Sequence, residues 1–129
     1  MIVVDTSALM AVLLDEPTRP AVAEALFAAR SVSISAGTLI ECAVVSRRRG
    51  VAPRMHDLLA EVAPATLPID AEAVGRIRAA DARWGVGPAR LNFGDLFAYD
   101  AAISRNAPLL FVGDDFAATD VRSALEETP

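Results

Sequence analysis

The stretch MIVVDTSALM (residues 1–10) decides how the chain begins and, with it, the class of fold. Residues 1–5 form a short apolar run with β-branched side chains, which is typical of a fully buried first strand. A helix is expected directly afterwards, at ALMAVLLDE (8–16). Asp5 therefore falls where a buried parallel strand meets its helix, so its carboxylate is either a helix cap or a functional group.

Short strands and longer helices are expected to alternate along the chain. The strands fall at about residues 1–5, 32–35, 65–69 and 109–112, and the helices at 8–16, 20–30, 36–50, 53–63, 70–85 and 92–106. Gly50 is a typical residue after a helix end, and Pro68 indicates an edge strand or the end of a strand. This alternation predicts an α/β fold with a mostly parallel sheet covered by helices on both sides.

The composition agrees with this fold class. The chain has 129 residues, enough for one domain over 1–129, and its 53% hydrophobic content includes only 5% aromatic residues, which suits helices on a parallel sheet. The single cysteine, Cys42, lies in an apolar stretch and is expected to be a core residue in a reducing compartment. No segment is apolar enough for a membrane span and the start lacks a secretion signal, so a cytoplasmic location is expected.

Acidic residues follow the strands or interrupt apolar helices at several points. Asp5 follows the first strand, and the acids of GDDF (113–116) follow the last one. Ligands bind beyond the carboxyl ends of strands in such sheets, so these acids are expected at one edge. Glu41 and Asp95 each interrupt an apolar stretch of a predicted helix, where charges are rare unless they are paired. These positions are candidates for one shared site.

Each acid also has a purely structural explanation. Asp5 could cap the first helix, Glu41 could face solvent, and Asp95 could favour the positive end of its helix. Asp114 and Asp115 could be ordinary turn residues. These explanations need independent coincidences, whereas one shared site explains all of the acids together.

Carboxylates gathered in one cleft repel each other, and a divalent cation removes that repulsion. Oxygen ligands without a histidine or cysteine partner suit Mg²⁺ or Mn²⁺ rather than zinc, and His56, the only histidine, is expected to face solvent. Such a cation supports hydrolysis of a phosphodiester bond by water without a protein nucleophile. It also gives a phosphate a place to bind despite the net charge of −5, which argues against a general attraction to nucleic acid.

Four motifs in this order resemble the PIN-domain ribonucleases, and more narrowly the VapC-type toxins of toxin–antitoxin pairs. The motifs are MIVVDTSALMAVLLDEP at the start, TLIECAVVSRR in the first third, LNFGDLFAYDAA late, and LLFVGDDFAATDV near the end. The resemblance spans essentially the whole chain. It implies a three-layer α/β/α fold and a Mg²⁺-dependent endoribonuclease in which Asp5, Glu41 and Asp95 are metal and water ligands.

The fourth acid comes from the GDDF turn, where the resemblance leaves two candidates. Related chains commonly have GNDF here, so Asp115 matches the shared aspartate and Asp114 replaces an asparagine. Both are candidate metal ligands, with a slight preference for Asp114 because it is nearer the strand end. Ser7 matches a family hydroxyl that orients a bound water or carboxylate, and is a candidate at the substrate site. Ser7 could instead cap the first helix, as could Thr6.

Helix spacing adds expectations for residues beyond the acids. Arg48 lies about two turns, or ~10 Å, from the proposed metal on one helix face and is a candidate phosphate contact. The arginine run 47–49 is nevertheless more often a solvated helix end. Asp100 lies about 140° around the helix from Asp95 and is expected outside the cluster, whereas Tyr99 is expected nearer to it.

The resemblance also implies partners. A VapB-type antitoxin would lie across the site and often place an arginine beside the acids. Proteins of this family usually form a toxin homodimer within a larger complex with the antitoxin. The helices at 8–16 and 20–30 carry more apolar residues than one core-facing stripe requires. That surplus indicates either an interface with such a partner or plain core packing.

Two other functions stay open from the residues alone. A phosphatase with Asp5 as nucleophile requires a second aspartate two positions further on. The chain has Ser7 there, which argues against this function. A binding domain without activity would have no use for carboxylates that repel each other.

Overall fold

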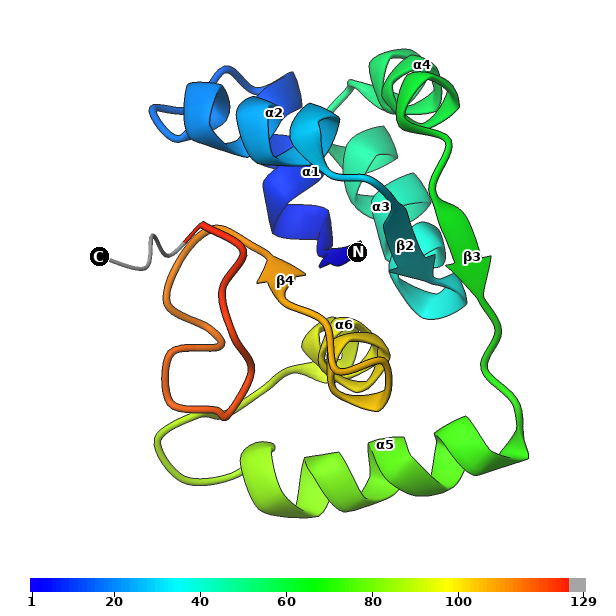
Figure 1. Ribbon diagram of the computed structural model, residues 1–129, viewed down its shortest axis with the longest axis vertical. Helices are drawn as coiled ribbons and strands as arrows, with labels where there is room; N and C mark the ends of the chain where they lie inside the picture. Colours follow the sequence, from blue (N-terminus) through cyan, green and yellow to red (C-terminus); the bar gives the residue numbers. More distant parts are fainter. Residues whose placement is uncertain (126–129) are drawn as a thin grey trace.

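A parallel four-stranded sheet lies at the centre of the computed structural model, which describes residues 1–125 (Figure 1). Its strands are β1 (Ile2–Val4), β2 (Val32–Ser35), β3 (Ala65–Leu67) and β4 (Leu109–Leu110), in the spatial order β3-β2-β1-β4. Every neighbouring pair is parallel. Because β1 lies inside the sheet, the residue that follows it emerges at the middle of the carboxyl edge.

Helices cover both faces of this sheet (Figure 1). They are α1 (Thr6–Leu13), α2 (Arg19–Ala28), α3 (Ala36–Arg48), α4 (Ala52–Val62), α5 (Ala71–Trp84) and α6 (Phe93–Ser104). The helices α1 to α4 pack together over one face, and α5 and α6 lie over the other. The predicted three-layer α/β/α fold with a parallel sheet is confirmed.

Alternating side chains of the strands divide the core into two clusters. Val4 and Leu110 pack with α1 to α4, whereas Val3 and Leu109, one residue earlier in each strand, pack with α5 and α6. All of these side chains are completely buried. This is the two-residue period of a strand, and burial on both faces explains why the strand sequences are continuously apolar.

The first helix begins earlier than the sequence predicts. Asp5 is its N-cap, because its Oδ2 accepts a hydrogen bond from the backbone N–H of Ser7 at 3.1 Å. The expectation that Thr6 or Ser7 caps this helix is wrong, since both already lie within its first turn. Every residue of α1 except Ser7 is buried, so its apolar surplus is core packing. On α2, by contrast, Phe27 is 53% exposed.

Two residues predicted to mark the ends of secondary-structure elements are confirmed. Gly50 follows the end of α3 with a φ of +72°, a left-handed conformation that favours glycine. The strand β3 is an edge strand and ends directly before Pro68, which has no N–H to donate to a neighbour.

Cys42 and His56 have the burial that the sequence predicts. Cys42 is completely buried, and burial raises the pKa of its thiol to about 11, which confirms its role in the core. His56 is exposed on α4, as expected. Within residues 1–125, no helix combines the length and the apolar character that crossing a membrane requires.

Candidate active site

A cavity of about 270 Å³ lies where β1 and β4 end and where α1 and α6 begin. Its walls come from segments that are far apart in the sequence. The lining residues are Asp5, Thr6, Ser7, Met10, Leu14, Glu16, Glu41, Val45, Arg49, Asn92, Asp95, Val112 and Asp115. The structure thus brings Asp5, Glu41, Asp95 and one acid of the GDDF turn to the same cavity, at the predicted edge of the sheet.

Asp5 is 4% exposed, and its two carboxylate oxygens have different surroundings. Oδ2 accepts hydrogen bonds from the N–H of Ser7 at 3.1 Å and from its hydroxyl at 2.6 Å. The Ser7 hydroxyl in turn accepts a bond from the N–H of Val112 at 3.0 Å, beyond the end of β4, which is shorter than the expected 109–112. Oδ1 is buried and has no hydrogen-bond partner among the described residues. Ser7 therefore fixes the carboxylate and leaves one oxygen unpaired.

Glu41 reaches the cavity from α3 and is half-buried. The Thr6 hydroxyl donates a 2.6 Å hydrogen bond to its Oε1. On α6, a Cβ added to Gly94 would overlap the Glu41 carboxylate, so the two helices approach closely at this point. Glu41 is therefore held between α1 and α6, and does not simply project into solvent.

Asp95 lies in the first turn of α6 and is 8% exposed. It forms a capping box with Asn92: the Asp95 N–H donates to Asn92 Oδ1 at 2.9 Å, and the Asn92 N–H donates to Asp95 Oδ2 at 3.0 Å. The same carboxylate thus caps a helix and lines the cavity, as the Asp5 carboxylate also does. The structural explanation of these two acids does not exclude a functional one.

The GDDF turn contributes Asp115, and not Asp114, to the cavity wall. Gly113 has a φ of +99°, and Phe116 is 2% exposed and anchors the turn in the core. Asp115 is also near enough to raise the pKa of Asp95. The slight preference for Asp114 is therefore reversed: nearness to the strand end does not bring a side chain to the cavity, because the chain turns sharply at Gly113.

The buried acids of the cavity resist ionisation. Burial raises the pKa of Asp5 from the usual 3.8 to about 6, although the bonds from Ser7 act in the opposite direction. The charges of Glu41 and Asp95 add to this rise. Burial also raises the pKa of Asp95 to about 6, with smaller contributions from Asp115 and Glu41. A cation beside these carboxylates would favour their charged forms.

The donors of the cavity fit a hard divalent cation. They are carboxylate and hydroxyl oxygens without histidine or cysteine, and Asp5 Oδ1 is a buried oxygen that lacks a partner among residues 1–125. In the same range, no three Asp, Glu, His or Cys side chains are grouped closely enough to bind one ion as they stand. Glu41 is engaged by Thr6 instead, and Asp95 by a backbone N–H. This open arrangement suits an ion bound by one or two carboxylates that keeps several waters, as Mg²⁺ usually is.

The arginine at the cavity is not the predicted one. Arg49 lines the acidic cavity and Arg48 does not. Arg48 lies instead at an apolar groove of about 400 Å³ between α3 and α6, which also includes Glu41, Val45, Ile40 and Phe93. Arg48 thus shares a helix face with Glu41, as the spacing predicts, but it reaches this groove and not the acidic cavity. Arg49, the C-cap beyond the regular helix, lines the cavity in its place.

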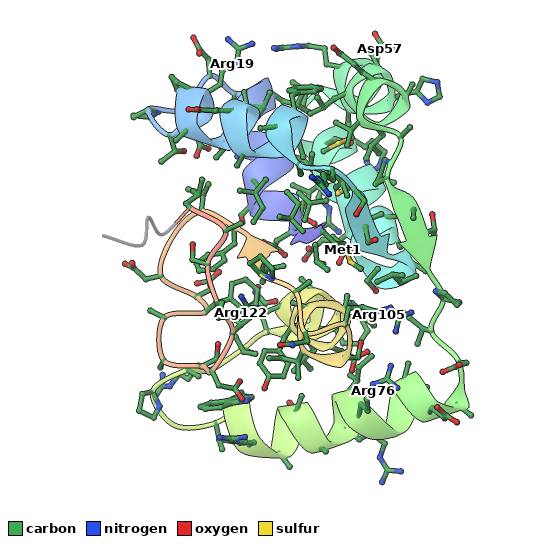
Figure 2. All side chains as sticks on the ribbon, in the orientation of Figure 1. Met1, Arg19, Asp57, Arg76, Arg105 and Arg122 are labelled. Atoms are coloured by element: carbon green, nitrogen blue, oxygen red, sulfur yellow. The ribbon has the colours of Figure 1, made fainter. Side chains whose placement is uncertain are left out.

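Two residues in the middle of α6 lie away from the cavity. Tyr99 donates from its hydroxyl to Asp120 at 2.6 Å and accepts a bond from Trp84 at 2.9 Å. Tyr99, which is expected nearer to the acids than Asp100, does not line the cavity, because its face of α6 packs against α5. Asp100 lies outside the cavity, as expected, and accepts bonds of 2.8 and 3.2 Å from Arg76. Figure 2 shows Arg76 on the side of α5 that is turned toward α6.

Some residues that shape the cavity were not among the sequence candidates. The spacing of Asn92 and Asp95 is a readable capping-box signal, and could have identified Asn92. The bond from Thr6 to Glu41 joins positions 35 residues apart and depends on how α1 crosses α3, so no sequence spacing reveals it. Glu16, beyond the end of α1, lines the cavity without any distinctive sequence context.

Residues 2–122 match the family model of the PIN domain, which is the class of protein that the fold and the acidic cavity define. The chain is also 43% identical over 130 residues to ribonuclease VapC28 of Mycobacterium tuberculosis, with 96% of this chain and 98% of the relative covered. The chain therefore belongs to the PIN-domain family and, within it, to the VapC ribonucleases. This confirms the resemblance drawn from the motifs, and neither the phosphatase nor the binding-only alternative finds support in these matches.

Solved structures agree with this assignment at the level of the fold. A toxin–antitoxin complex from Klebsiella pneumoniae matches with a TM-score of 0.73 at 20% identity, covering 99% of this chain and 100% of the other. VapC20 of Mycobacterium tuberculosis, described as a sarcin–ricin loop cleaving toxin, matches with a TM-score of 0.72 at 16% identity, covering 94% and 96%. At such low identities these likenesses concern the fold alone.

Proposed function

We propose that this protein is a Mg²⁺-dependent endoribonuclease that acts as the toxin of a type II toxin–antitoxin pair. The proposal depends on one observation: a single cavity beyond the carboxyl ends of the strands is lined by Asp5, Glu41, Asp95 and Asp115. Membership of the VapC ribonucleases supports RNA as the substrate and the cytoplasm as the place of action.

In this proposal, Asp5 and Asp95 hold the cation. Both carboxylates are buried, both are fixed by hydrogen bonds, and both have a pKa raised by burial. Glu41 and Asp115 are more exposed and would act on the ion through water. When bound, the ion would lower the pKa of a water molecule and stabilise negative charge on the phosphate and the leaving oxygen.

The residues of the chain would prepare the site for this reaction. Ser7 holds Asp5 through its hydroxyl and its N–H, which keeps Oδ1 turned away from protein donors. Thr6 holds Glu41 in the cavity wall, where its carboxylate would accept the proton that the attacking water releases. Side chains fixed before the substrate arrives need little reorganisation during the reaction.

The proposed partners are a VapB-type antitoxin and a second copy of the toxin. The neighbour from Klebsiella pneumoniae is a toxin–antitoxin complex, and an acidic cavity suits a basic side chain of an antitoxin. In support of a homodimer, Ile40 is 67% exposed and Phe93 is 78% exposed beside the apolar groove. Light scattering of the purified protein with and without an Ile40→Asp substitution would test the homodimer.

The nuclease proposal is tested by incubating the purified protein with cellular RNA, with and without Mg²⁺. We expect cleavage only with Mg²⁺, and a loss of roughly 100-fold or more in Asp5→Asn, since one ligand charge at the reacting centre is removed. Asp57→Asn makes the same chemical change at an exposed position on α4 (Figure 2) that does not line the cavity, and should cleave like the original protein. Equal cleavage by the Asp5→Asn protein would overturn the proposal, because a contaminant would then be responsible.

A further inference from the structure

The cavity is strongly acidic, although its proposed substrate is a polyanion. Its walls carry the acids Asp5, Glu16, Glu41, Asp95 and Asp115. Within the described part of the chain, the only basic residue that lines it is Arg49. A divalent ion offsets part of this negative charge, but the phosphates on either side of the cleaved bond still need a cationic contact.

Arg49 is available for such a contact. Its backbone N–H is bonded to the carbonyl of Val45 at 3.0 Å, so the base of its side chain has a fixed position at the end of α3. Its exposed side chain has no hydrogen bond or ion pair within residues 1–125. Three other arginines, Arg19, Arg76 and Arg83, pair with aspartates and are already engaged.

The preceding arginines differ from Arg49 in direction. Neither Arg47 nor Arg48 lines the acidic cavity. Successive helical residues point about 100° apart, and Arg48 lies at the apolar groove between α3 and α6, which Glu41 also lines. All three arginines are exposed at the same helix end, but Arg47 lines neither the acidic cavity nor this groove. Arg47 is therefore a matched control for Arg49.

We propose that Arg49 binds the phosphate backbone of RNA at the rim of the acidic cavity. The choice of RNA as ligand rests on the proposed function. A guanidinium group can donate two parallel N–H bonds to one phosphate, which gives both charge and orientation. Arg49 thereby positions the strand beside the carboxylates, while the acids themselves stay free for the cation.

The test measures RNA binding separately from cleavage. The Glu41→Gln protein, which keeps the proposed ion ligands Asp5 and Asp95, is titrated, with Mg²⁺ present, into a fluorescently labelled RNA pool of random sequence at several salt concentrations. Adding Arg49→Ala should weaken binding roughly ten-fold, which is the effect of losing one hydrogen bond to a charged group. The slope of log Kd against log salt concentration should fall by about 0.7, because one phosphate contact is lost. Arg49→Lys should restore the slope but only part of the affinity, because lysine keeps the charge without the two-donor geometry.

Arg47→Ala in the same background should leave both affinity and slope nearly unchanged. The inference is overturned if Arg49→Ala binds like its parent, if Arg47→Ala loses as much as Arg49→Ala, or if the parent shows no binding at low salt. Melting temperatures establish that each variant is folded. Cleavage by the unmodified protein is measured in parallel, so that a failure at Arg49 is distinguishable from a failure of the nuclease proposal itself.

Discussion

Asp5 and Asp95 make the stability of the metal-free protein depend on pH. In the folded protein each carboxyl has a pKa of about 6, above the value of 3.8 expected when the chain is unfolded. Between these values the folded protein holds protons that the unfolded chain has released. Their contribution therefore favours folding at low pH and is lost as pH rises to about 6. For Asp5, which is almost fully buried, the shift corresponds to roughly 3 kcal/mol.

We expect Asp5→Asn to remove part of this pH dependence, because an amide does not ionise. In EDTA, the free energy of unfolding by urea should fall less between about pH 4.5 and pH 7 in Asp5→Asn than in the original protein. Asp57→Asn, at an exposed position, should follow the original curve. Identical curves for the two variants would show that the environment of Asp5 does not shift its pKa.

The cation should stabilise the protein only where the carboxylates are ionised. Mg²⁺ should raise the melting temperature at about pH 7.5 and have little effect near pH 5, because protons then compete for Asp5 and Asp95. Asp115→Asn should reduce the effect, and Asp114→Asn should not, since only Asp115 lines the cavity. The reverse ranking of these adjacent variants would return the fourth acid to Asp114.

At the scale of elements, the site depends on how closely α3 and α6 approach each other. A Cβ at Gly37 would overlap the ring of Phe97, and a Cβ at Gly94 would overlap the carboxylate of Glu41. Both glycines have ordinary helical positions, so they are required for the close approach and not for an unusual backbone conformation. At Gly94 this close approach leaves just enough room for the Glu41 carboxylate, which Thr6 also binds.

Gly94→Ala should therefore damage the site. We expect the methyl group to displace the Glu41 carboxylate and to reduce RNA cleavage at least ~10-fold, as losses of positioned catalytic groups do. Gly75→Ala is the matched control: Gly75 lies within α5 with no atom near its added Cβ. That control should raise the free energy of unfolding by about 0.5–1 kcal/mol and leave cleavage unchanged. Unimpaired cleavage by Gly94→Ala would show that Glu41 has no fixed place in the reaction.

The order and type of the elements could be predicted because each has a strong local signal. The apolar run before Asp5, the break at Gly50 and the proline after β3 each act within a few residues. The start of α1 depends on which of three possible caps is used, Asp5, Thr6 or Ser7. The structure selects Asp5, which ends the strand and begins the helix in one residue. The hydrogen-bond partners of Tyr99 are not predictable in this way, because they depend on the packing of α5 against α6, which no local pattern records.

At the scale of the whole molecule, the sequence identifies the acids but not their immediate partners. Parallel strands end at one edge, and that rule alone brings Asp5 and the GDDF turn together. Which acid of the GDDF turn and which arginine line the cavity, by contrast, depends on local turns at Gly113 and at the end of α3. One-residue differences of this kind are set by backbone geometry that the sequence does not display.

The most direct measurement is the position of the ion itself. Crystals grown with Mn²⁺ in place of Mg²⁺ allow the ion to be located by anomalous diffraction. The proposed site predicts a peak in the acidic cavity at roughly 2.1–2.3 Å from carboxylate oxygens of Asp5 and Asp95, and no such peak in Asp5→Asn crystals. A peak elsewhere in the molecule, or none beside Asp5 with excess Mn²⁺, would contradict a metal-dependent nuclease built on these acids.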